Sequence, residues 1–417
     1  MSQVLDVYLS PECVGKLYLD DERRFVFKYH AEWVADHEVQ PLSLSLPVRT
    51  EPYHHARAQA FFSNLLPEAE IRHLVAKSLG LSENNDFALL EAIGGECAGA
   101  VSLFPEGTVF PIQSDYKKLN DDALNQLIAE LPTQPMMAGE QNIRLSLAGA
   151  QNKLPVFYKD HEISIPTGIA ASSHILKPPI KHYPNTVENE YFCMQLAKRI
   201  GLNVPETQIL HKAVPLYLIT RYDRIRNKQG ELIRLSQEDF CQAMAIPPIN
   251  KYEKEGGPSL KACFDLVRNH SIQPAKDLNE LLNWVIFNVL IGNADAHGKN
   301  ISLMLTSAGP LLAPFYDLMS TAIYPNLAQK MAMKIGGEDR PDWIIARRWE
   351  QFSKDTGIKF KLVRQRCLDM ANTLSSISVE LASECQQQHG ENDQIKKIVA
   401  LIEQRKSKID TIFNISK

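Results

Sequence analysis

The stretch NADAHGKN, residues 293–300, follows an apolar run and holds an acid and an amide, Asp295 and Asn300, five positions apart. The protein-kinase catalytic loop has the same separation: its aspartate accepts the proton of the attacking hydroxyl and its asparagine holds Mg²⁺. Asp and Asn also form turns that end helices. On these residues alone, a phosphoryl-transfer loop and a plain turn are both open.

A second acid in a suitable setting is Asp317, in LLAPFYDLMS, 22 residues beyond Asp295. It directly follows an apolar and aromatic run that is typical of a strand. A carboxylate at the end of a strand behind the loop can supply a ligand to the Mg²⁺ that bridges phosphate oxygens. The structural alternative is an aspartate that caps a helix or forms a turn.

The segment after Asn185 predicts a helix over about 186–200, begun by a capping box of Asn185 and Glu188. Helical spacing places Glu188 on a polar face, whereas Glu190 lies on the other face beside Met194. Because burying a lone carboxylate is costly, we expect Glu190 to form an ion pair.

The candidate partner of Glu190 is Lys177, in the extended run SSHILKPP. A strand lysine paired with a helix glutamate is the arrangement by which kinases direct an ammonium at the phosphates of ATP. The alternative is a surface lysine and a glutamate that belongs to an unrelated structural pair.

The segment RLSLAGAQNK, residues 144–153, lies between two strand-like runs and carries small residues at 148–150. Backbone N–H groups of such a loop can approach a phosphate closely, because no bulky side chain intervenes. A simple hairpin turn explains Gly149 equally well.

Composition is that of an ordinary globular protein, with 44% hydrophobic, 23% charged and 8% aromatic residues. A length of 417 residues and a formal charge of −4 predict ~2 to 3 domains and argue against binding nucleic acid through bulk charge. The seven cysteines include no C-x-x-C pair, which indicates reduced thiols. No leader and no membrane-spanning run are recognisable, so we expect a cytoplasmic protein.

Strand-like and helix-like patterns divide the chain. Residues 1–30 predict a small antiparallel sheet, and EAEIRHLVAKSLGL predicts a helix that ends near a glycine. TVFPIQSDYKKLNDD and LPTQPMMAGEQN are interpreted as connections. IRLSLAG, LPVFYK, EISIP, HILKP and PLYLITRYD predict strands, and long helical patterns dominate from 258 onward. A mixed α/β lobe followed by a helical lobe favours a ligand site where the two meet.

Taken together, these motifs resemble the HipA family of bacterial serine/threonine kinases, the toxins of HipA/HipB toxin–antitoxin pairs. The resemblance extends over almost the whole chain. Its motifs are FFSNLLPE, RLSLAGAQNKLPV, HILKPP, VENEYFCMQLAKRIGL, RYDR, RLSQEDFCQAM, NADAHGKNISLM and PFYDLMS.

The resemblance implies an α+β, two-lobed protein-kinase-like fold with a mixed α/β N-terminal lobe and an all-helical C-terminal lobe. We expect an N-terminal subdomain over 1–110, the ATP-binding part of the N-lobe over 140–250, and the helical C-lobe with the catalytic loop over 251–417. The cofactors would be ATP and Mg²⁺. The catalytic base would be Asp295, the metal ligands Asn300 and Asp317, and the ATP-binding residues Ala148, Gly149, Ala150, Gln151, Asn152, Lys153, Lys177, Thr220 and Tyr222.

Members of the family also phosphorylate a serine in their own phosphate loop, which corresponds to Ser146 and is associated with loss of activity. A phosphate of about −1.5 to −2 charge there would compete with the phosphates of ATP. The alternative is an ordinary strand residue. We interpret His297 as a residue that orients the loop, and Asp223 with Arg224 as a structural ion pair.

The resemblance further implies a growth-inhibiting toxin that phosphorylates a translation-related protein, with glutamyl-tRNA synthetase as the expected substrate. A HipB-type DNA-binding antitoxin would restrain it and bring it to operator DNA, where the pair co-represses its operon. Two alternatives are a small-molecule phosphotransferase, which shares the acid-to-asparagine spacing, and a non-catalytic corepressor. Basic clusters such as Arg347 with Arg348, Lys396 with Lys397, and Arg405 to Lys408 are interpreted as solvated helix faces rather than as DNA contacts.

Overall fold

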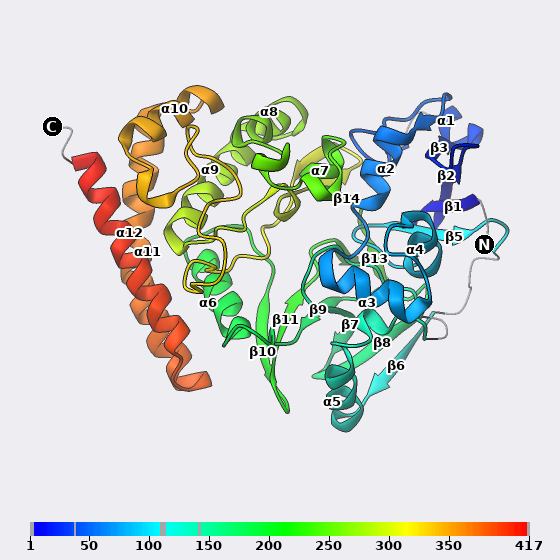
Figure 1. The fold of residues 1–417 in the computed structure, drawn as a ribbon, viewed down its shortest axis with the longest axis horizontal. Coiled ribbons are helices and arrows are strands. Elements are labelled where there is room, and N and C mark those ends of the chain that lie inside the picture. The colour runs from blue at the N-terminus through cyan, green and yellow to red at the C-terminus, as the bar shows by residue number, and fades with distance from the viewer. Residues whose placement is uncertain (1–3, 37–38, 109–113, 141–142, 415–417) are drawn as a thin grey trace. The chain divides into compact units, whose positions relative to one another are not determined.

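The computed structural model describes residues 4–36, 39–108, 114–140 and 143–414 (Figure 1). The chain forms two compact units. Unit 1 comprises Met1–Pro178, Leu210–Ile249 and Leu303–Gly309. Unit 2 comprises Pro179–Ile209, Asn250–Ser302 and Pro310–Lys417. Among the described residues, no helix is both long and apolar enough to cross a membrane.

The first sheet of unit 1 confirms the antiparallel sheet predicted for residues 1–30. Its strands run in the order β4-β3-β2-β1-β5. Leu5, Val7 and Leu9 alternate with less buried residues along β1, so one face of the sheet packs into the core. The strands are β1 (Val4–Leu9), β2 (Glu12–Leu19), β3 (Phe25–Tyr29), β4 (Tyr53–His54) and β5 (Val101–Pro105).

Four helices belong to the same part of unit 1: α1 (Ala31–Ala35), α2 (His55–Ser63), α3 (Ala69–Leu79) and α4 (Asp86–Ile93). Helix α3 is the one predicted from EAEIRHLVAKSLGL. It ends at Gly80, whose left-handed backbone (φ 65°) closes the last turn as expected for a C-terminal glycine.

The second sheet of unit 1 carries the strands β11-β9-β7-β8-β6 as antiparallel neighbours. The strands predicted from LPVFYK, EISIP, HILKP and PLYLITRYD are confirmed. The strand predicted from IRLSLAG is wrong, because the segment forms only isolated bridges at Leu145 and Gly149. The strands are β6 (Ser114–Leu119), β7 (Leu154–Lys159), β8 (Glu162–Gly168), β9 (His174–Lys177) and β11 (Pro215–Thr220).

The connection predicted from TVFPIQSDYKKLNDD is wrong over the part that is described. SDYKKL forms edge strand β6, paired with β8, and the Asn120 side chain then caps α5 (Asp121–Glu130) by accepting from the Ala123 N–H. Residues 109–113 of this connection, and 141–142 of LPTQPMMAGEQN, lie outside the described residues. The remaining elements of unit 1 are η1 (Pro135–Met137), β12 (Arg224–Arg226), β13 (Leu232–Arg234), β14 (Gln237–Asp239) and α7 (Phe240–Ala243).

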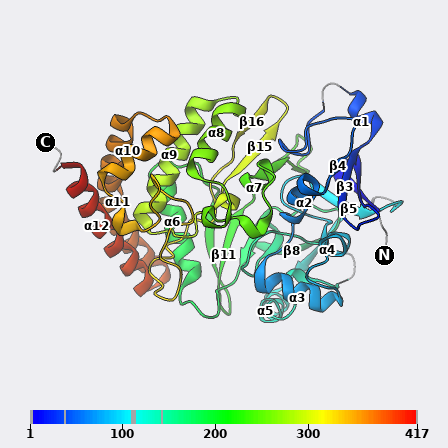
Figure 2. The ribbon, with the colours of Figure 1, turned by 45° about the horizontal axis from the view of Figure 1, so that its top comes forward.

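Unit 2 is built from long helices, as the pattern beyond residue 258 predicts. Helix α9 is buried almost all round in its second half, and α11 and α12 lie side by side (Figure 1, Figure 2). The helices are α6 (Thr186–Arg199), α8 (Leu260–His270), α9 (Pro274–Ile291), α10 (Ala346–Thr356), α11 (Phe360–His389) and α12 (Asp393–Asn414). Its short elements are η3 (Glu253–Glu255), η4 (Gly298–Asn300) and η5 (Pro341–Trp343). Four further elements include residues of both units: β10 (Thr207–His211), η2 (Pro248–Asn250), β15 (Ser302–Thr306) and β16 (Gly309–Leu312).

The helix predicted for 186–200 is confirmed as α6, but its predicted capping box is wrong. Asn185 has a left-handed backbone (φ 55°, ψ 39°) and its side chain makes no capping hydrogen bond. A capping residue normally has extended backbone, which directs its side chain at the free N–H groups of the first turn. A capping box does occur at α7, between Asp239 and Gln242.

A buried acid in unit 1 makes stability depend on pH. Glu238 on β14 is fully buried, where its carboxyl accepts from the Leu44 N–H at 2.9 Å and also contacts the Ser43 hydroxyl. Burial raises the pKa of Glu238 to about 8. The folded chain therefore retains a proton that the unfolded chain releases near pH 4.5.

We expect the free energy of unfolding to fall by up to ~1.4 kcal/mol per pH unit between about pH 5 and 8 because of Glu238, and this contribution to level off above pH 8. Glu238→Gln mimics the protonated acid, so it should remove that part of the slope. Urea denaturation from pH 5 to 9 measures the slope, with the exposed Glu162→Gln as control. Equal slopes for wild type and Glu238→Gln would show that Glu238 is ionised in the folded chain.

Candidate active site

The loop with the predicted chemistry begins where α9 ends. Gly292 takes a left-handed backbone (φ 73°) and its N–H closes the last turn of α9. The next segment is fixed from outside the loop, because the Ala294 N–H donates to the Thr321 hydroxyl at 2.8 Å and the Ala332 N–H donates to the Ala294 carbonyl at 2.9 Å. Asp295 therefore follows a short turn that hydrogen bonds to residues outside the loop hold in place.

The carboxylate of Asp295 is accessible and oriented. Its side chain is 49% exposed, and one oxygen accepts from the Tyr252 hydroxyl at 2.6 Å. The Asp295 N–H donates to the side-chain oxygen of Asn293 at 3.1 Å. A carboxylate held at one oxygen and open to solvent can accept a proton from a bound hydroxyl.

The Asn300 side chain contacts the main chain of Asp295. Its side-chain Nδ2 donates to the main-chain carbonyl of Asp295 at 3.1 Å, and its own N–H donates to the His297 carbonyl at 2.9 Å. Because Nδ2 is used in this way, Oδ1 is the atom of the amide that can bind a cation. The predicted roles of Asp295 and Asn300 are compatible with this geometry.

Asp317 follows a residue that is anchored to the same loop. The Tyr316 hydroxyl donates to the Lys299 carbonyl at 2.7 Å and lies 2.8 Å from the Ser302 hydroxyl. Asp317 itself has a left-handed backbone (φ 58°), which is uncommon for a residue other than glycine and is frequent at functional turns. Carboxylate and amide oxygens are the donors that Mg²⁺ prefers, so the donor set of Asn300 and Asp317 fits that ion.

His297 and Lys299 are buried within the loop, at 5% and 6% exposure. The His297 ring packs edge-on against the Tyr252 ring, with centroids 5.3 Å apart. Its Nε2 lies 4.0 Å from the carboxylate of Asp295. This position agrees with the interpretation of His297 as a residue that orients the loop.

Helix α6 is hydrogen-bonded to Ser320, in the segment that follows Asp317. The Asn189 side chain donates to the Ser320 carbonyl and accepts from the Ser320 N–H, both at 2.9 Å. Its neighbour Glu190 is 1% exposed, as the helical face predicts. The predicted ion pair of Glu190 with Lys177 joins residues of different units and stays a prediction.

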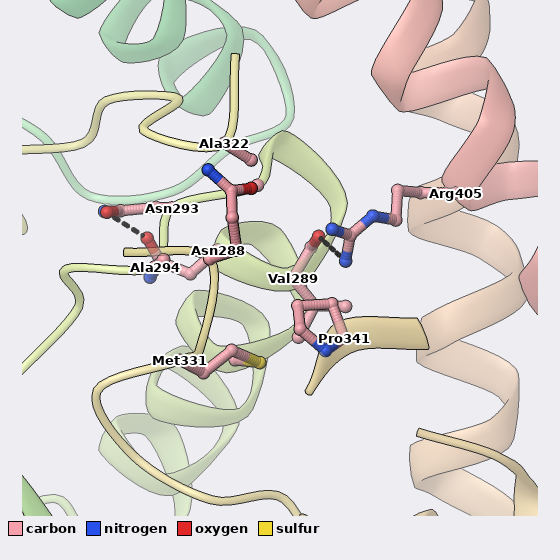
Figure 3. Close-up of a pocket in the computed structure, with 10 residues that line it drawn as sticks. Asn288, Val289, Asn293, Ala294, Ala322, Met331, Pro341 and Arg405 are labelled. Atoms are coloured by element: carbon pink, nitrogen blue, oxygen red, sulfur yellow. Dashed lines mark hydrogen bonds between the residues drawn. The ribbon is translucent and has the colours of Figure 1, made fainter. Parts of the chain in front are cut away.

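Helix α12 contacts the C-terminal end of α9. The Arg405 guanidinium donates to the Val289 carbonyl at 3.3 Å, and burial lowers its pKa (Figure 3). The interpretation of a solvated helix face is therefore wrong at Arg405. A small cavity of about 10 Å³ lies there, lined by residues of α9 and of the loop that include Asn288 and Asn293. A cavity of this size holds on the order of one water. It is therefore too small to bind a substrate.

In unit 1, the predicted phosphate loop packs against the residues after α2. The Glu68 N–H donates to the Gly149 carbonyl at 3.1 Å, and Gly149 has a φ of 114°. The Lys153 ammonium contacts the Ala148 carbonyl, which closes 148–153 into a compact turn. The hairpin that the alternative required is not formed, because the segment before Gly149 is no strand and Gly149 itself makes an isolated parallel bridge with Pro67.

Ser146 is fully buried in this arrangement. Its hydroxyl donates to the Leu65 carbonyl at 2.7 Å, and its N–H donates to the Glu96 carbonyl at 3.0 Å. A kinase could not reach the hydroxyl in this state. Modification of Ser146 therefore requires residues 144–149 to leave their site.

Of the remaining predicted ATP residues, Lys177 ends β9 and Thr220 ends the neighbouring strand β11. The prediction that one strand contains both Thr220 and Tyr222 is wrong, because Tyr222 lies in the turn after β11. Tyr217 pairs with Lys177 across β11 and β9, and the Lys177 ammonium lies 5.7 Å from the Tyr217 ring centroid. The Thr220 hydroxyl lies 3.2 Å from a ring nitrogen of His174. The Tyr222 hydroxyl donates to the Gln237 side chain at 2.6 Å. Since these hydroxyls are engaged by the protein, adenine would meet mainly the backbone here.

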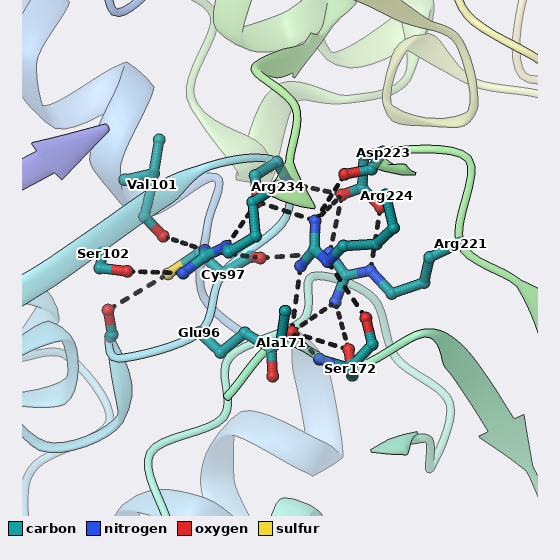
Figure 4. A network of polar contacts seen from close by, with 12 residues as sticks. Glu96, Cys97, Val101, Ser102, Ala171, Ser172, Arg221, Asp223, Arg224 and Arg234 are labelled. Atoms are coloured by element: carbon teal, nitrogen blue, oxygen red, sulfur yellow. Dashed lines mark hydrogen bonds and ion pairs between the residues drawn. The ribbon is translucent and has the colours of Figure 1, made fainter. Parts of the chain in front are cut away.

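A buried charge network connects Glu96 and Ser172 with the arginines and the aspartate of the RYDR motif (Figure 4). Glu96 accepts from the Arg224 guanidinium at 3.0 Å and from the Ser172 hydroxyl at 2.7 Å. Arg221 donates two hydrogen bonds to Asp223, at 2.7 and 3.0 Å. Burial alone would raise the pKa of Glu96, but Arg221, Arg224 and Arg234 outweigh it and lower that pKa.

The predicted ion pair of Asp223 and Arg224 is confirmed at 3.1 Å. Sequence reasoning missed the roles of Tyr252, Asn189 and Glu96. Their partners are 43 or more positions away along the chain, so no local spacing marks them.

Comparison with known proteins agrees with these observations. The family profile of the HipA-like C-terminal domain matches residues 145–378, and that of the HipA N-terminal domain matches residues 5–104. Y4mE of Sinorhizobium fredii, which is named as a kinase, is 43% identical over 378 residues, covering 89% of this chain and 90% of the relative.

The serine/threonine-protein kinase toxin HipA of Shewanella oneidensis is 32% identical over 395 residues, covering 90% of this chain and 89% of the relative. A solved structure of HipA from the same organism, in complex with HipB and operator DNA, matches with a TM-score of 0.85 and 30% identity. That match covers 98% of this chain and 97% of the solved one. The chain therefore belongs to the HipA family of serine/threonine protein kinases and has the two-lobed kinase-like fold of that family.

Proposed function

We propose that this kinase transfers a phosphoryl group from ATP, with Mg²⁺, to a serine of a cellular protein and thereby acts as a growth-inhibiting toxin. The observation that carries the proposal is the geometry of the loop 293–300. Its acid is open to solvent and oriented by Tyr252, while its amide is held against the same acid's main chain. A plain helix-ending turn does not require this arrangement.

In this proposal, Asp295 accepts the proton of the attacking hydroxyl. Asn300 and Asp317 would hold Mg²⁺, which supplies charge neutralisation at the phosphates when it is bound. Tyr252 and His297 keep the Asp295 carboxylate in position. Their contacts, a hydrogen bond and a ring packed edge-on, support an orienting role.

We assign the ATP phosphates to residues 148–153 and Lys177, and adenine to the segment formed by Thr220, at the end of β11, and Tyr222, in the turn that follows. This makes 140–250 the ATP-binding part of the N-lobe and 251–417 the C-lobe with the catalytic loop, after an N-terminal subdomain over 1–110. A pairing of Lys177 with Glu190 would orient the lysine, and the burial of both side chains, at 7% and 1% exposure, supports it.

A HipB-type antitoxin is the proposed partner in the cytoplasm, because the solved relative is a complex with HipB and operator DNA. Operator DNA would be reached mainly through that antitoxin. In agreement, Arg348, Lys396 and Lys408 each lie within ion-pair distance of an acid of this chain. The proposed substrate, a translation-related protein such as glutamyl-tRNA synthetase, rests on the family resemblance alone.

Two other functions make different predictions. A small-molecule phosphotransferase would label a low-molecular-weight alcohol and no protein. A non-catalytic corepressor would label neither. The polar groups of the loop, complete and in contact with each other, favour a catalyst over the corepressor.

Autophosphorylation of Ser146 is the proposed means of inactivation. A phosphate of about −1.5 to −2 charge cannot remain in the buried position that the hydroxyl occupies. The phosphorylated segment would leave its site beside Leu65 and Glu96, and the phosphate loop would lose its packing.

Asp295→Asn should lower the rate of phosphoryl transfer by ~10²- to 10⁴-fold, because the amide cannot accept the proton. ATP affinity should stay close to wild type, since the amide oxygen can still accept from Tyr252 and the bond from Asn300 goes to the main chain. Transfer of labelled phosphate into cell-extract proteins and calorimetric titration with ATP measure the two quantities.

The matched control is Asp393→Asn, which removes an exposed carboxylate at the start of α12. Its rate and ATP affinity should both equal wild type. Transfer by Asp295→Asn at the wild-type rate would reject Asp295 as the base.

Ser146→Ala should abolish incorporation of phosphate into the chain itself while leaving transfer to other proteins intact. Loss of the hydrogen bond to Leu65 should lower stability by ~1 kcal/mol. Mass spectrometry after incubation with ATP locates the phosphate, with Ser78→Ala on α3 as control. Undiminished self-phosphorylation in Ser146→Ala, or a phosphate found at another residue of the wild type, would contradict the assignment.

A further inference from the structure

The outer face of the first sheet carries a group of ligands that the kinase function does not use. Among the residues that the structure describes, Asp6, Cys13 and His30 form the one group of three acidic, thiol or imidazole side chains whose ligand atoms all lie within 4.8 Å of one another. Each is half-buried. They come from β1, from β2 and from the residue that follows β3.

A bulge in β2 is what brings Cys13 onto this face. Val7 pairs with Gly15, but the next residue, Tyr8, pairs with Cys13, so one residue of β2, Val14, is extra. Val14 is fully buried, while Cys13 lies on the half-buried face with Asp6 and Tyr8. Without the extra residue, strict alternation would turn Cys13 toward the core.

His30 is fixed next to the bulge. Its N–H donates to the Val14 carbonyl at 3.0 Å, and its extended backbone begins α1. The ring nitrogen Nε2 lies 3.4 Å from the Cys13 sulfur. On the other side, one oxygen of the Asp6 carboxylate accepts from the Gly107 N–H at 3.3 Å, which orients the carboxylate and leaves its second oxygen for a ligand.

We propose that Asp6, Cys13 and His30 form a zinc site on the first sheet. Thiolate, imidazole and carboxylate are the ligands of Zn²⁺ in proteins, and three of them with an open fourth position form a recognised type of site. Ligand distances of ~2.3 Å to sulfur and ~2.0 Å to nitrogen, at a tetrahedral angle, place the two atoms ~3.5 Å apart. The observed 3.4 Å between the Cys13 sulfur and the His30 ring nitrogen matches that spacing, and an Asp6 oxygen lies within 4.8 Å of both atoms.

The chemistry of the group selects zinc over the Mg²⁺ of the kinase reaction. Mg²⁺ needs octahedral oxygen donors, which a site with one sulfur and one nitrogen cannot supply. Bound zinc would join β1, β2 and the start of α1 at one point. It would therefore stabilise the folded state of the first sheet by binding it in preference to the unfolded chain.

The zinc site is tested on the full-length chain by titration with Co²⁺, whose thiolate complexes absorb in the near ultraviolet and whose tetrahedral complexes absorb strongly in the visible. Wild type should bind one Co²⁺ with both bands, Zn²⁺ should displace it, and a millimolar excess of Mg²⁺ should not. Zn²⁺ should also raise the melting temperature of the wild type.

Cys13→Ser should lose the thiolate band, and His30→Gln should bind at least ~10-fold more weakly. His73→Gln, an exposed histidine on α3 that pairs with Glu83, is the matched control and should bind like wild type. Metal-free melting curves show whether each variant is folded. If wild type shows no thiolate band, or if Cys13→Ser retains it, Cys13 and His30 form only a thiol–imidazole hydrogen bond and the zinc site is rejected.

Discussion

The position of the loop 293–300, the proposed catalytic loop, depends on helix α9 ending at Gly292. This residue has a left-handed backbone, and a Cβ placed on it would lie 2.5 Å from a methyl of Leu401 and 2.9 Å from the Cβ of Ala322. Any other residue would therefore combine backbone strain with a clash. Because Gly292 fits, its carbonyl can accept from the Ala322 N–H at 2.9 Å, and Asp295 emerges three residues later in a fixed position.

In unit 1, a network of buried charged side chains holds the segment 144–153 in place. Removing Arg221, Arg224 and Glu96 from water costs several kcal/mol for each ion, so the network is stable only while its members stay paired. Glu96 also accepts, through its main chain, the N–H of Ser146. Ser146, whose phosphorylation is the proposed means of inactivation, therefore packs on Glu96, which also anchors the RYDR motif. Displacement of residues 144–149 would disturb the contacts of Glu96 with Ser146 and with the RYDR motif.

Local patterns predicted the first three strands of the first sheet and helix α6, because period and spacing carry that information directly. The edge strand β6 was missed, since its polar alternation is typical of a connection as well as of an edge. The capping box at Asn185 failed because the backbone there is left-handed. Tyr252 and Asn189 could not be predicted at all, since their roles arise from contacts between distant segments. The ligand roles of Asn300 and Asp317 remain predictions.

The most direct measurement is anomalous diffraction from crystals of the chain grown with Mn²⁺ and a non-hydrolysable ATP analogue. The account predicts an anomalous peak within coordination distance of the Asn300 side-chain oxygen and the Asp317 carboxylate, with the terminal phosphate bound to the same ion. A peak bound to other residues, with Asn300 and Asp317 directed away from the nucleotide, would contradict it.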